Sequence, residues 1–198
     1  MSGQEMTTGE CLAWEKWNKT GQWDATVCAA AAFLGKLDEI KVAAETNPNN
    51  LDFQFMFISS DVFAAAARGG HIHILTWMYE RGHRPNGQGS ACTSAAYGNQ
   101  DATLKWLHEK GFRSDESTCA NIAFRGNLPL LQWARARGCP WNEYTCESAA
   151  EGGHLVLLQW CRAQDPPCPW STKTLAKAIE HRHQSIVMWL RFKEPTWH

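Results

Sequence analysis

The chain has 198 residues and a formal net charge of −1, and it is long enough to form one domain with a substantial core. The near-neutral charge excludes a general electrostatic attraction to nucleic acid or to anionic membranes. No stretch of the sequence approaches the roughly 18 apolar residues of a membrane-spanning helix, so we expect no membrane insertion.

The N-terminal segment, residues 1–22, shows neither the pattern of a secretion signal nor the Arg-rich, acid-poor pattern of a transit peptide. We therefore expect a cytoplasmic protein, with the nucleus, a virion or another large assembly as alternatives. The segment carries no complete copy of the repeat that fills the rest of the chain. We interpret it as a helical N-terminal cap, with a degenerate repeat as the alternative.

A repeated unit, clearest as WNEYTCESAAEGGHLVLLQW from Trp141 to Trp160, recurs along the remaining sequence. Self-similarity at a period of about 20–50 residues is typical of repeat proteins. Copies start at residues 23, 58, 87, 114, 141 and 170. They place six repeats in residues 23–192 and leave a C-terminal tail at 193–198.

Each copy encodes two helices joined by a tight turn. If the first residue of a copy is position zero, position one is mostly a residue that caps helix N-termini, such as Asp24 or Asn142. Position twelve is Gly or Asn, which tolerate the left-handed conformation that ends a helix, except for Arg182 in the last copy. Apolar residues at positions fourteen, seventeen and nineteen mark the buried stripe of a second helix. The predicted fold class is all-α, an α-solenoid of stacked helix-turn-helix repeats with short loops.

Two runs, AAEGGHL from Ala149 to Leu155 and AARGGHI from Ala66 to Ile72, resemble the AAxxGHL motif of the ankyrin repeat. The GCPW loop from Gly138 to Trp141 is similar to the short ankyrin-like arrays of protists and giant viruses. The resemblance covers about residues 23–192. Most copies are shorter than the usual repeat of about 33 residues, so most of the projecting hairpin finger is missing. The resemblance implies that the histidines of the GH motif, His71 and His154, form structural hydrogen bonds between neighbouring repeats.

The resemblance also implies a protein partner bound on the concave side, by loops and by the two positions that follow the paired small residues. These positions change from aromatic and basic in the middle copies to acidic at the C-terminal end, whereas the packing positions stay similar. Aromatic residues and Arg are common at binding hot spots. An alternative for the two phenylalanines of this set is that they cover the helix of the next repeat. The predicted partner-binding residues are Phe33, Arg68, Tyr97, Phe124, Arg125, Tyr144 and Glu151.

The longest link between copies contains an alternating apolar and polar stretch at residues 51–57. Phe53 and Phe55 in this stretch are either an exposed contact for the partner or a filling for the gap left by the weaker first repeat. We keep both residues among the candidate partner contacts.

No motif indicates catalysis, a cofactor or a metal site. The glycine pairs lie at helix–helix turns rather than between a strand and a helix. The pairs His71–His73 and His181–His183 have a spacing that does not place both rings on one helical face. Most of the tryptophans occupy positions zero or nineteen with Leu, Gln and Pro as sequence neighbours, so we interpret them as packing rather than as a base-stacking surface.

The cysteines favour a reducing compartment. Cys28, Cys92, Cys119 and Cys146 all occupy position five of a copy. Neighbouring members of this set lie about one repeat apart, too far for a disulfide. We expect reduced cysteines in the core. Together these patterns predict a non-enzymatic protein-binding module, with a permanently docked accessory subunit of a large assembly as the alternative.

Overall fold

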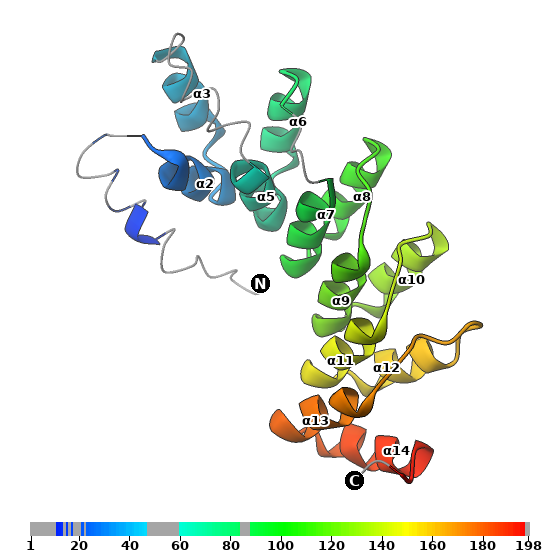
Figure 1. The fold of residues 1–198 in the computed structure, drawn as a ribbon. Helices are drawn as coiled ribbons and strands as arrows, with labels where there is room; N and C mark the ends of the chain where they lie inside the picture. Colours follow the sequence, from blue (N-terminus) through cyan, green and yellow to red (C-terminus); the bar gives the residue numbers. More distant parts are fainter. Residues whose placement is uncertain are drawn as a thin grey trace. The chain divides into compact units, whose positions relative to one another are not determined.

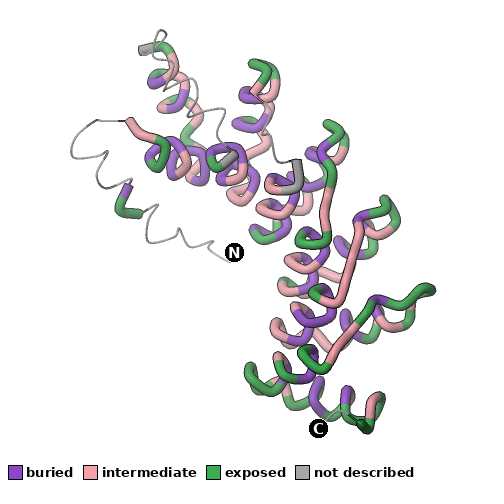
Figure 2. The backbone as a smooth tube through the Cα atoms, in the orientation of Figure 1, coloured by how far each residue is buried: buried purple, intermediate pink, exposed green. Residues whose placement is uncertain are grey.

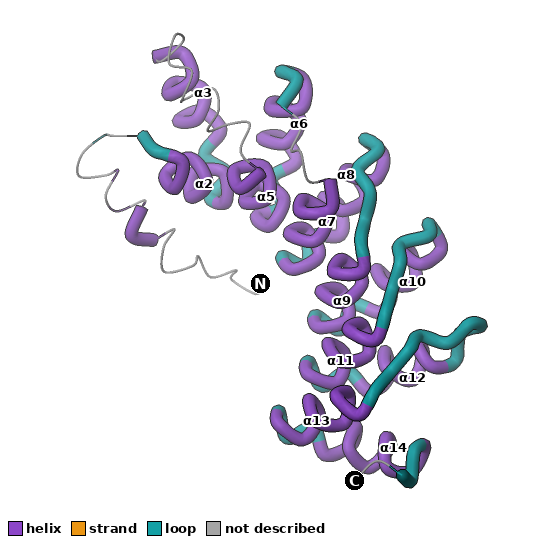
Figure 3. Tube along the Cα trace, viewed as in Figure 1, coloured by secondary structure: helices purple, strands orange, loops and turns teal. Residues whose placement is uncertain are grey.

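The structure is a computed structural model that describes residues 23–46, 60–83 and 88–196, together with residues 11–13, 15, 17 and 21. Within these residues all regular secondary structure is helical, which confirms the predicted all-α class (Figure 1, Figure 3). No helix formed by the described residues is long and apolar enough to span a bilayer. Phe53 and Phe55 lie outside the described residues.

In the N-terminal segment, residues 11–13, 15 and 17 have helical backbone. The ring of Trp17 lies 5.4 Å from that of Trp23, the first residue of the first copy.

The helices come in pairs that follow the predicted copies. The first three pairs are α2 (Ala25–Phe33) with α3 (Leu37–Thr46), α5 (Ser60–Gly69) with α6 (Ile72–Glu80), and α7 (Gln88–Tyr97) with α8 (Asp101–Glu109). The other three are α9 (Glu116–Phe124) with α10 (Leu128–Ala136), α11 (Glu143–Glu151) with α12 (Leu155–Arg162), and α13 (Thr172–Glu180) with α14 (Gln184–Lys193).

The chain divides into two compact units, an N-terminal unit of residues 1–112 and a C-terminal unit of residues 113–198. In the N-terminal unit α5 packs between α2 and α7, and in the C-terminal unit α11 packs between α9 and α13 (Figure 1). Each of these first helices also packs against the second helix of its own pair. Within each unit the first helices therefore form a row to which the second helices are attached.

The first helices begin at side chains that bind their free backbone N–H groups. The Asp24 carboxylate accepts hydrogen bonds from the N–H groups of Thr26 and Val27 at 3.0 and 2.9 Å. Asp115 and Asn142 cap α9 and α11 in the same way. Such caps contribute about 1 kcal/mol each, and they confirm the predicted role of position one in these copies.

Small side chains allow neighbouring first helices to approach closely. Buried residues recur along the first helices of both units (Figure 2). The paired small residues at positions eight and nine include Ala31, Ala66, Ala95 and Ala149, all with no exposed surface. Because alanine adds only one methyl group to the backbone, the inner face of each first helix is nearly flat.

The turn inside one repeat receives the position-thirteen side chain of the next, a contact that we call the glycine–histidine seam. A Cβ added to Gly35 would lie 2.7 Å from Cε1 of the His71 ring, closer than non-bonded carbon atoms can approach. The same overlap would occur at Gly126 with His154 and at Gly153 with His183. Glycine at this turn therefore provides space for a ring as well as a left-handed backbone.

Two copies hold a larger residue at this turn. Asn99 and Arg182 take the left-handed conformation, with φ of +53° and +59°. Arg182 is the residue that departs from Gly or Asn in the sequence, yet its backbone conformation matches the other turns. The turn geometry is thus kept at a steric cost of about 1–2 kcal/mol for a residue with a Cβ.

The space requirement of the seam can be measured by comparing two glycines of the C-terminal unit. Gly126 and Gly138 have φ of +70° and +81°, but a Cβ would overlap the His154 ring at Gly126 and would meet nothing at Gly138. Both changes to Ala carry the left-handed strain, so Gly126→Ala should lower the free energy of unfolding by about 1–3 kcal/mol more than Gly138→Ala. Urea unfolding of both variants followed by circular dichroism tests this, and equal losses would contradict the seam.

Candidate functional site

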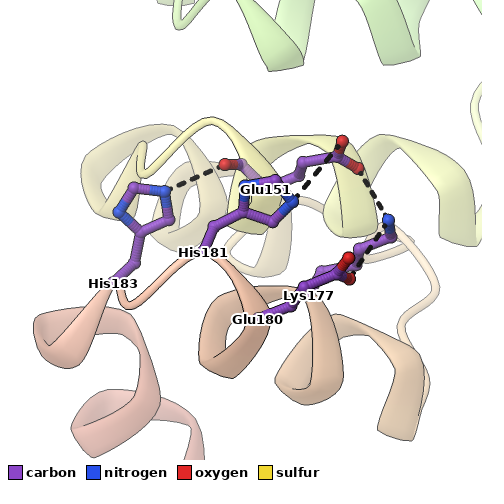
Figure 4. Close-up of polar contacts among 5 residues, drawn as sticks. All are labelled: Glu151, Lys177, Glu180, His181 and His183. Atoms are coloured by element: carbon purple, nitrogen blue, oxygen red, sulfur yellow. Dashed lines mark hydrogen bonds and ion pairs between the residues drawn. The ribbon is translucent and has the colours of Figure 1, made fainter.

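The seam fixes the backbone at position ten, where several predicted binding residues lie. The ring Nε2–H of each seam histidine donates to the carbonyl oxygen of the position-ten residue of the preceding repeat, which ends or nearly ends its first helix. The bonds are His71 to Phe33 at 2.7 Å and His154 to Phe124 at 3.0 Å. The third joins His183 to Glu151 at 2.9 Å (Figure 4). The bridges expected for His71 and His154 are thus confirmed, and His183 forms a third.

In the N-terminal unit, Phe33 is a packed residue rather than an accessible one. Only 6% of its surface is exposed, and the Arg68 guanidinium lies over its ring at 4.5 Å from the ring centroid. Arg68 therefore covers Phe33, in agreement with the alternative that this ring packs against the next repeat. Among the described residues of this unit, the exposed aromatic side chain is that of Tyr97, which is 46% exposed at the end of α7.

In the C-terminal unit, Phe124 is half-buried at the end of α9 and Arg125 follows it in an exposed position. The Arg125 guanidinium lies 5.8 Å from the centroid of the Phe124 ring. A cation near the ring face contributes an attraction of about 0.5–1 kcal/mol at an exposed site. The two residues thus place an aromatic ring and a positive charge side by side.

Glu151 belongs to a charge cluster in which its carboxylate is paired within the chain. Lys177 Nζ lies 3.3 Å and His181 Nε2 3.8 Å from its oxygens, and Lys177 also lies 3.5 Å from Glu180 (Figure 4). The hydrogen bond with Glu151, together with the charges of Glu151 and Glu180, raises the pKa of Lys177. This end of the surface therefore holds two carboxylates and one lysine, and its Glu151 carboxylate is paired within the chain.

Lys177 is a site residue that our sequence analysis missed. It precedes Glu180 by three residues on α13, and this spacing places the two side chains on one face of a helix. The spacing was a visible signal for this pair. The contact of Lys177 with Glu151 joins two repeats and depends on how α11 and α13 pack.

Tyr144 lies at the other end of α11 from Glu151. Seven residues separate the two, which corresponds to about 10 Å along a helix axis. Tyr144 is 54% exposed and lines a cleft of about 320 Å³ between α9 and α11, which we call the Tyr144 cleft. The other lining residues are Glu116, Ser117, Ala120, Asn121 and Asn142.

Arginine side chains cover several of the tryptophan rings. The guanidinium groups of Arg135 and Arg162 each lie 4.1 Å from a ring centroid, that of Trp141 and that of Trp170 respectively. The sequence neighbours Leu, Gln and Pro are therefore not the only residues beside these rings, because arginines several residues away along the chain lie over them. These ring faces are engaged in intramolecular cation–π contacts. Similar contacts join Arg81 to Trp77 and Arg137 to Trp133.

A second hollow, of about 300 Å³, lies beside these rings in the C-terminal unit. Trp141 and Trp160 line it together with Arg135, and their ring centroids are 6.0 Å apart in an edge-to-face arrangement. This hollow does not contain any of the predicted binding residues.

Within the part of the chain that the structure describes, no three His, Cys, Asp or Glu side chains are arranged to hold a metal ion. A comparison with known family models gives no match for this chain, and a comparison with curated protein sequences gives none either.

The histidine of the seam also predicts that the stability of the N-terminal unit depends on pH. Burial lowers the pKa of His71 below its ordinary value of 6.5, so the unfolded chain takes up a proton at this residue at a higher pH than the folded chain does. The contribution of His71 to stability is therefore complete above about pH 6.5 and is lost as the pH falls through its folded pKa.

The variant His71→Gln should unfold with a weaker dependence on pH between pH 8 and pH 5 than the original chain. Glutamine does not titrate, and Gln100 already lies against Gly70 at the equivalent place in the next repeat. Urea midpoints at several pH values measure the difference, and identical pH profiles would rule out the effect.

Proposed function

We propose that the chain is an array of six short ankyrin-like repeats that binds a protein partner through the surface of its first helices and has no catalytic activity. The observation that carries this proposal is a contrast in exposure between two sets of side chains on the first helices. The small residues between first helices are buried, whereas Tyr97 and Tyr144 expose large aromatic side chains. The seam fixes the backbone of this surface at Phe33, Phe124 and Glu151, and a pre-ordered surface loses little conformational entropy when it binds.

The Tyr144 cleft supports a partner segment that carries Lys or Arg. Glu116, which carries a carboxylate, and the exposed Tyr144 both line this cleft, together with Asn142, whose amide oxygen caps α11. An aromatic face near a carboxylate attracts a cation by both cation–π and ionic interactions. We therefore propose that a basic side chain of the partner enters this cleft.

A nucleic acid is not the partner that we propose. The net charge of the chain is −1, and binding to phosphates requires a surplus of Lys and Arg on one surface. Lys177 is paired with two carboxylates, and Arg135 and Arg162 stack on tryptophans. These cations already have partners within the chain.

A second candidate function, an accessory subunit docked permanently in a large assembly, is favoured by exposed apolar residues on the second helices. Met188 and Phe192 are four residues apart on α14, so they lie on one side of that helix, and Phe192 is 79% exposed. Val156 on α12 is also exposed. Apolar side chains of this size on a surface often mark a protein contact.

For the compartment we propose the cytoplasm. Seven of the cysteines are buried and all eight are free thiols in this structure, a state that a reducing compartment maintains.

The two candidate functions use different surfaces, so paired variants can separate them. The tagged full-length chain is purified from cells with its partner, and the dissociation constant of the purified pair is then measured by calorimetry. If the first-helix surface binds, the double variant Tyr97→Ala and Tyr144→Ala should weaken binding at least about tenfold, as expected for losing aromatic hot spots.

The matched control is the double variant Val156→Ala and Phe192→Ala, which removes exposed apolar side chains from second helices. It should bind like the original chain. The opposite result would support the accessory-subunit candidate instead. Circular dichroism of all variants should be unchanged, since each altered side chain is exposed.

A further inference from the structure

Two buried thiols are in direct contact in the C-terminal unit. Cys119 lies on α9 with its Sγ 3.0 Å from Sγ of Cys139, in the segment between α10 and α11. Both residues are buried. A disulfide bond is about 2.0 Å long, so the two sulfur atoms need to approach by only about 1 Å to form one.

The surroundings of the two sulfur atoms differ. The hydrogen bond from the Cys119 thiol lowers the pKa of Cys139, and Ser114 and Arg135 act in the same direction against the effect of burial. The same hydrogen bond, together with burial, raises the pKa of Cys119. One sulfur therefore favours the nucleophilic thiolate, and the other holds a proton that it can release to a leaving group.

We propose that Cys119 and Cys139 form an intrachain disulfide when the protein meets a peroxide, and that this bond fastens the loop of residues 137–142 to α9. The Cys139 thiolate first attacks hydrogen peroxide, which breaks the O–O bond, forms a sulfenic acid and releases hydroxide. The Cys119 sulfur then displaces the sulfenic hydroxyl group, which leaves as water with the Cys119 proton. The two sulfurs lose two electrons and the peroxide gains them.

The next copy also brings thiols together. Cys146 and Cys168 occupy the equivalent positions there, and hydrogen bonds with Cys146 and Cys161 lower the pKa of Cys168 to about 4. The sulfur–sulfur contact at 3.0 Å joins Cys119 and Cys139. Position five of the first copy is Cys28, which is buried at a different place in the chain. Cys28 thus provides an internal comparison.

The disulfide would act on the proposed binding surface. The loop of residues 137–142 ends at Asn142, which caps α11 and lines the Tyr144 cleft. A covalent link between residues 119 and 139 also closes a loop in the unfolded chain and so favours the folded state. Oxidation should therefore stabilise the C-terminal unit and restrict one wall of the cleft.

The test uses the reduced full-length protein, treated with hydrogen peroxide under native conditions and then alkylated with iodoacetamide in urea. Digestion with trypsin and glutamyl endopeptidase yields peptide 117–125, which contains only Cys119, and peptide 138–143, which contains only Cys139. We expect these peptides to be linked and lighter by two hydrogens, and the melting temperature to rise by several degrees. Dithiothreitol should reverse both changes.

Cys28→Ala is the matched control and should retain the link and the rise in melting temperature. Cys139→Ser should lose both. The reversal by dithiothreitol in the original chain keeps the test decisive if that variant does not fold. Alkylation of both Cys119 and Cys139 after peroxide treatment, or a link from Cys119 to another cysteine, would overturn the proposal. If the disulfide forms but the melting temperature does not change, the part of the proposal that the disulfide fastens the loop to α9 is wrong.

Discussion

The glycine–histidine seam is the interaction on which the rest of the structure depends. The last carbonyl groups of a helix have no partner within the helix, and an unsatisfied buried carbonyl costs about 1–3 kcal/mol. The histidine of the next repeat supplies the missing donor, as His71 does for Phe33. Its ring fits only because the turn it meets has no side chain. One contact therefore ends a helix, fills a space and positions the neighbouring repeat.

The same contact explains why the side chains at position ten can vary while the backbone of each repeat stays the same. The seam binds the backbone of position ten and leaves its side chain unconstrained, so Phe33 and Glu151 hold the same structural place with different chemistry. What each side chain offers then depends on its neighbours. Arg68 covers Phe33, and Lys177 pairs with Glu151. Only some of the equivalent positions are therefore accessible to a partner.

In the C-terminal unit a second recurring contact organises the loops between repeats. Arg135 stacks on Trp141 and also donates a hydrogen bond to the carbonyl oxygen of Cys139. Arg162 makes the same two contacts with Trp170 and Cys168. The two loops differ in length, yet the arginine holds each cysteine next to the first helix of its own repeat. This arrangement brings the Cys139 thiol to Cys119.

The sequence by itself determined the helix pairs, their caps and their turns, because these follow from hydrogen bonds and periodicities within a few residues. Asp24, Asp115 and Gly126 could be assigned in this way. Only the tertiary structure decided that Phe33 is buried, that arginines stack on the tryptophans and that the sulfur atoms of Cys119 and Cys139 touch. The contacts of Phe33 with Arg68 and of Cys119 with Cys139 join segments distant in the sequence, and those of arginines with tryptophans depend on how the intervening residues fold. The repeat shows which positions are equivalent, but what covers each side chain depends on how the surrounding segments pack.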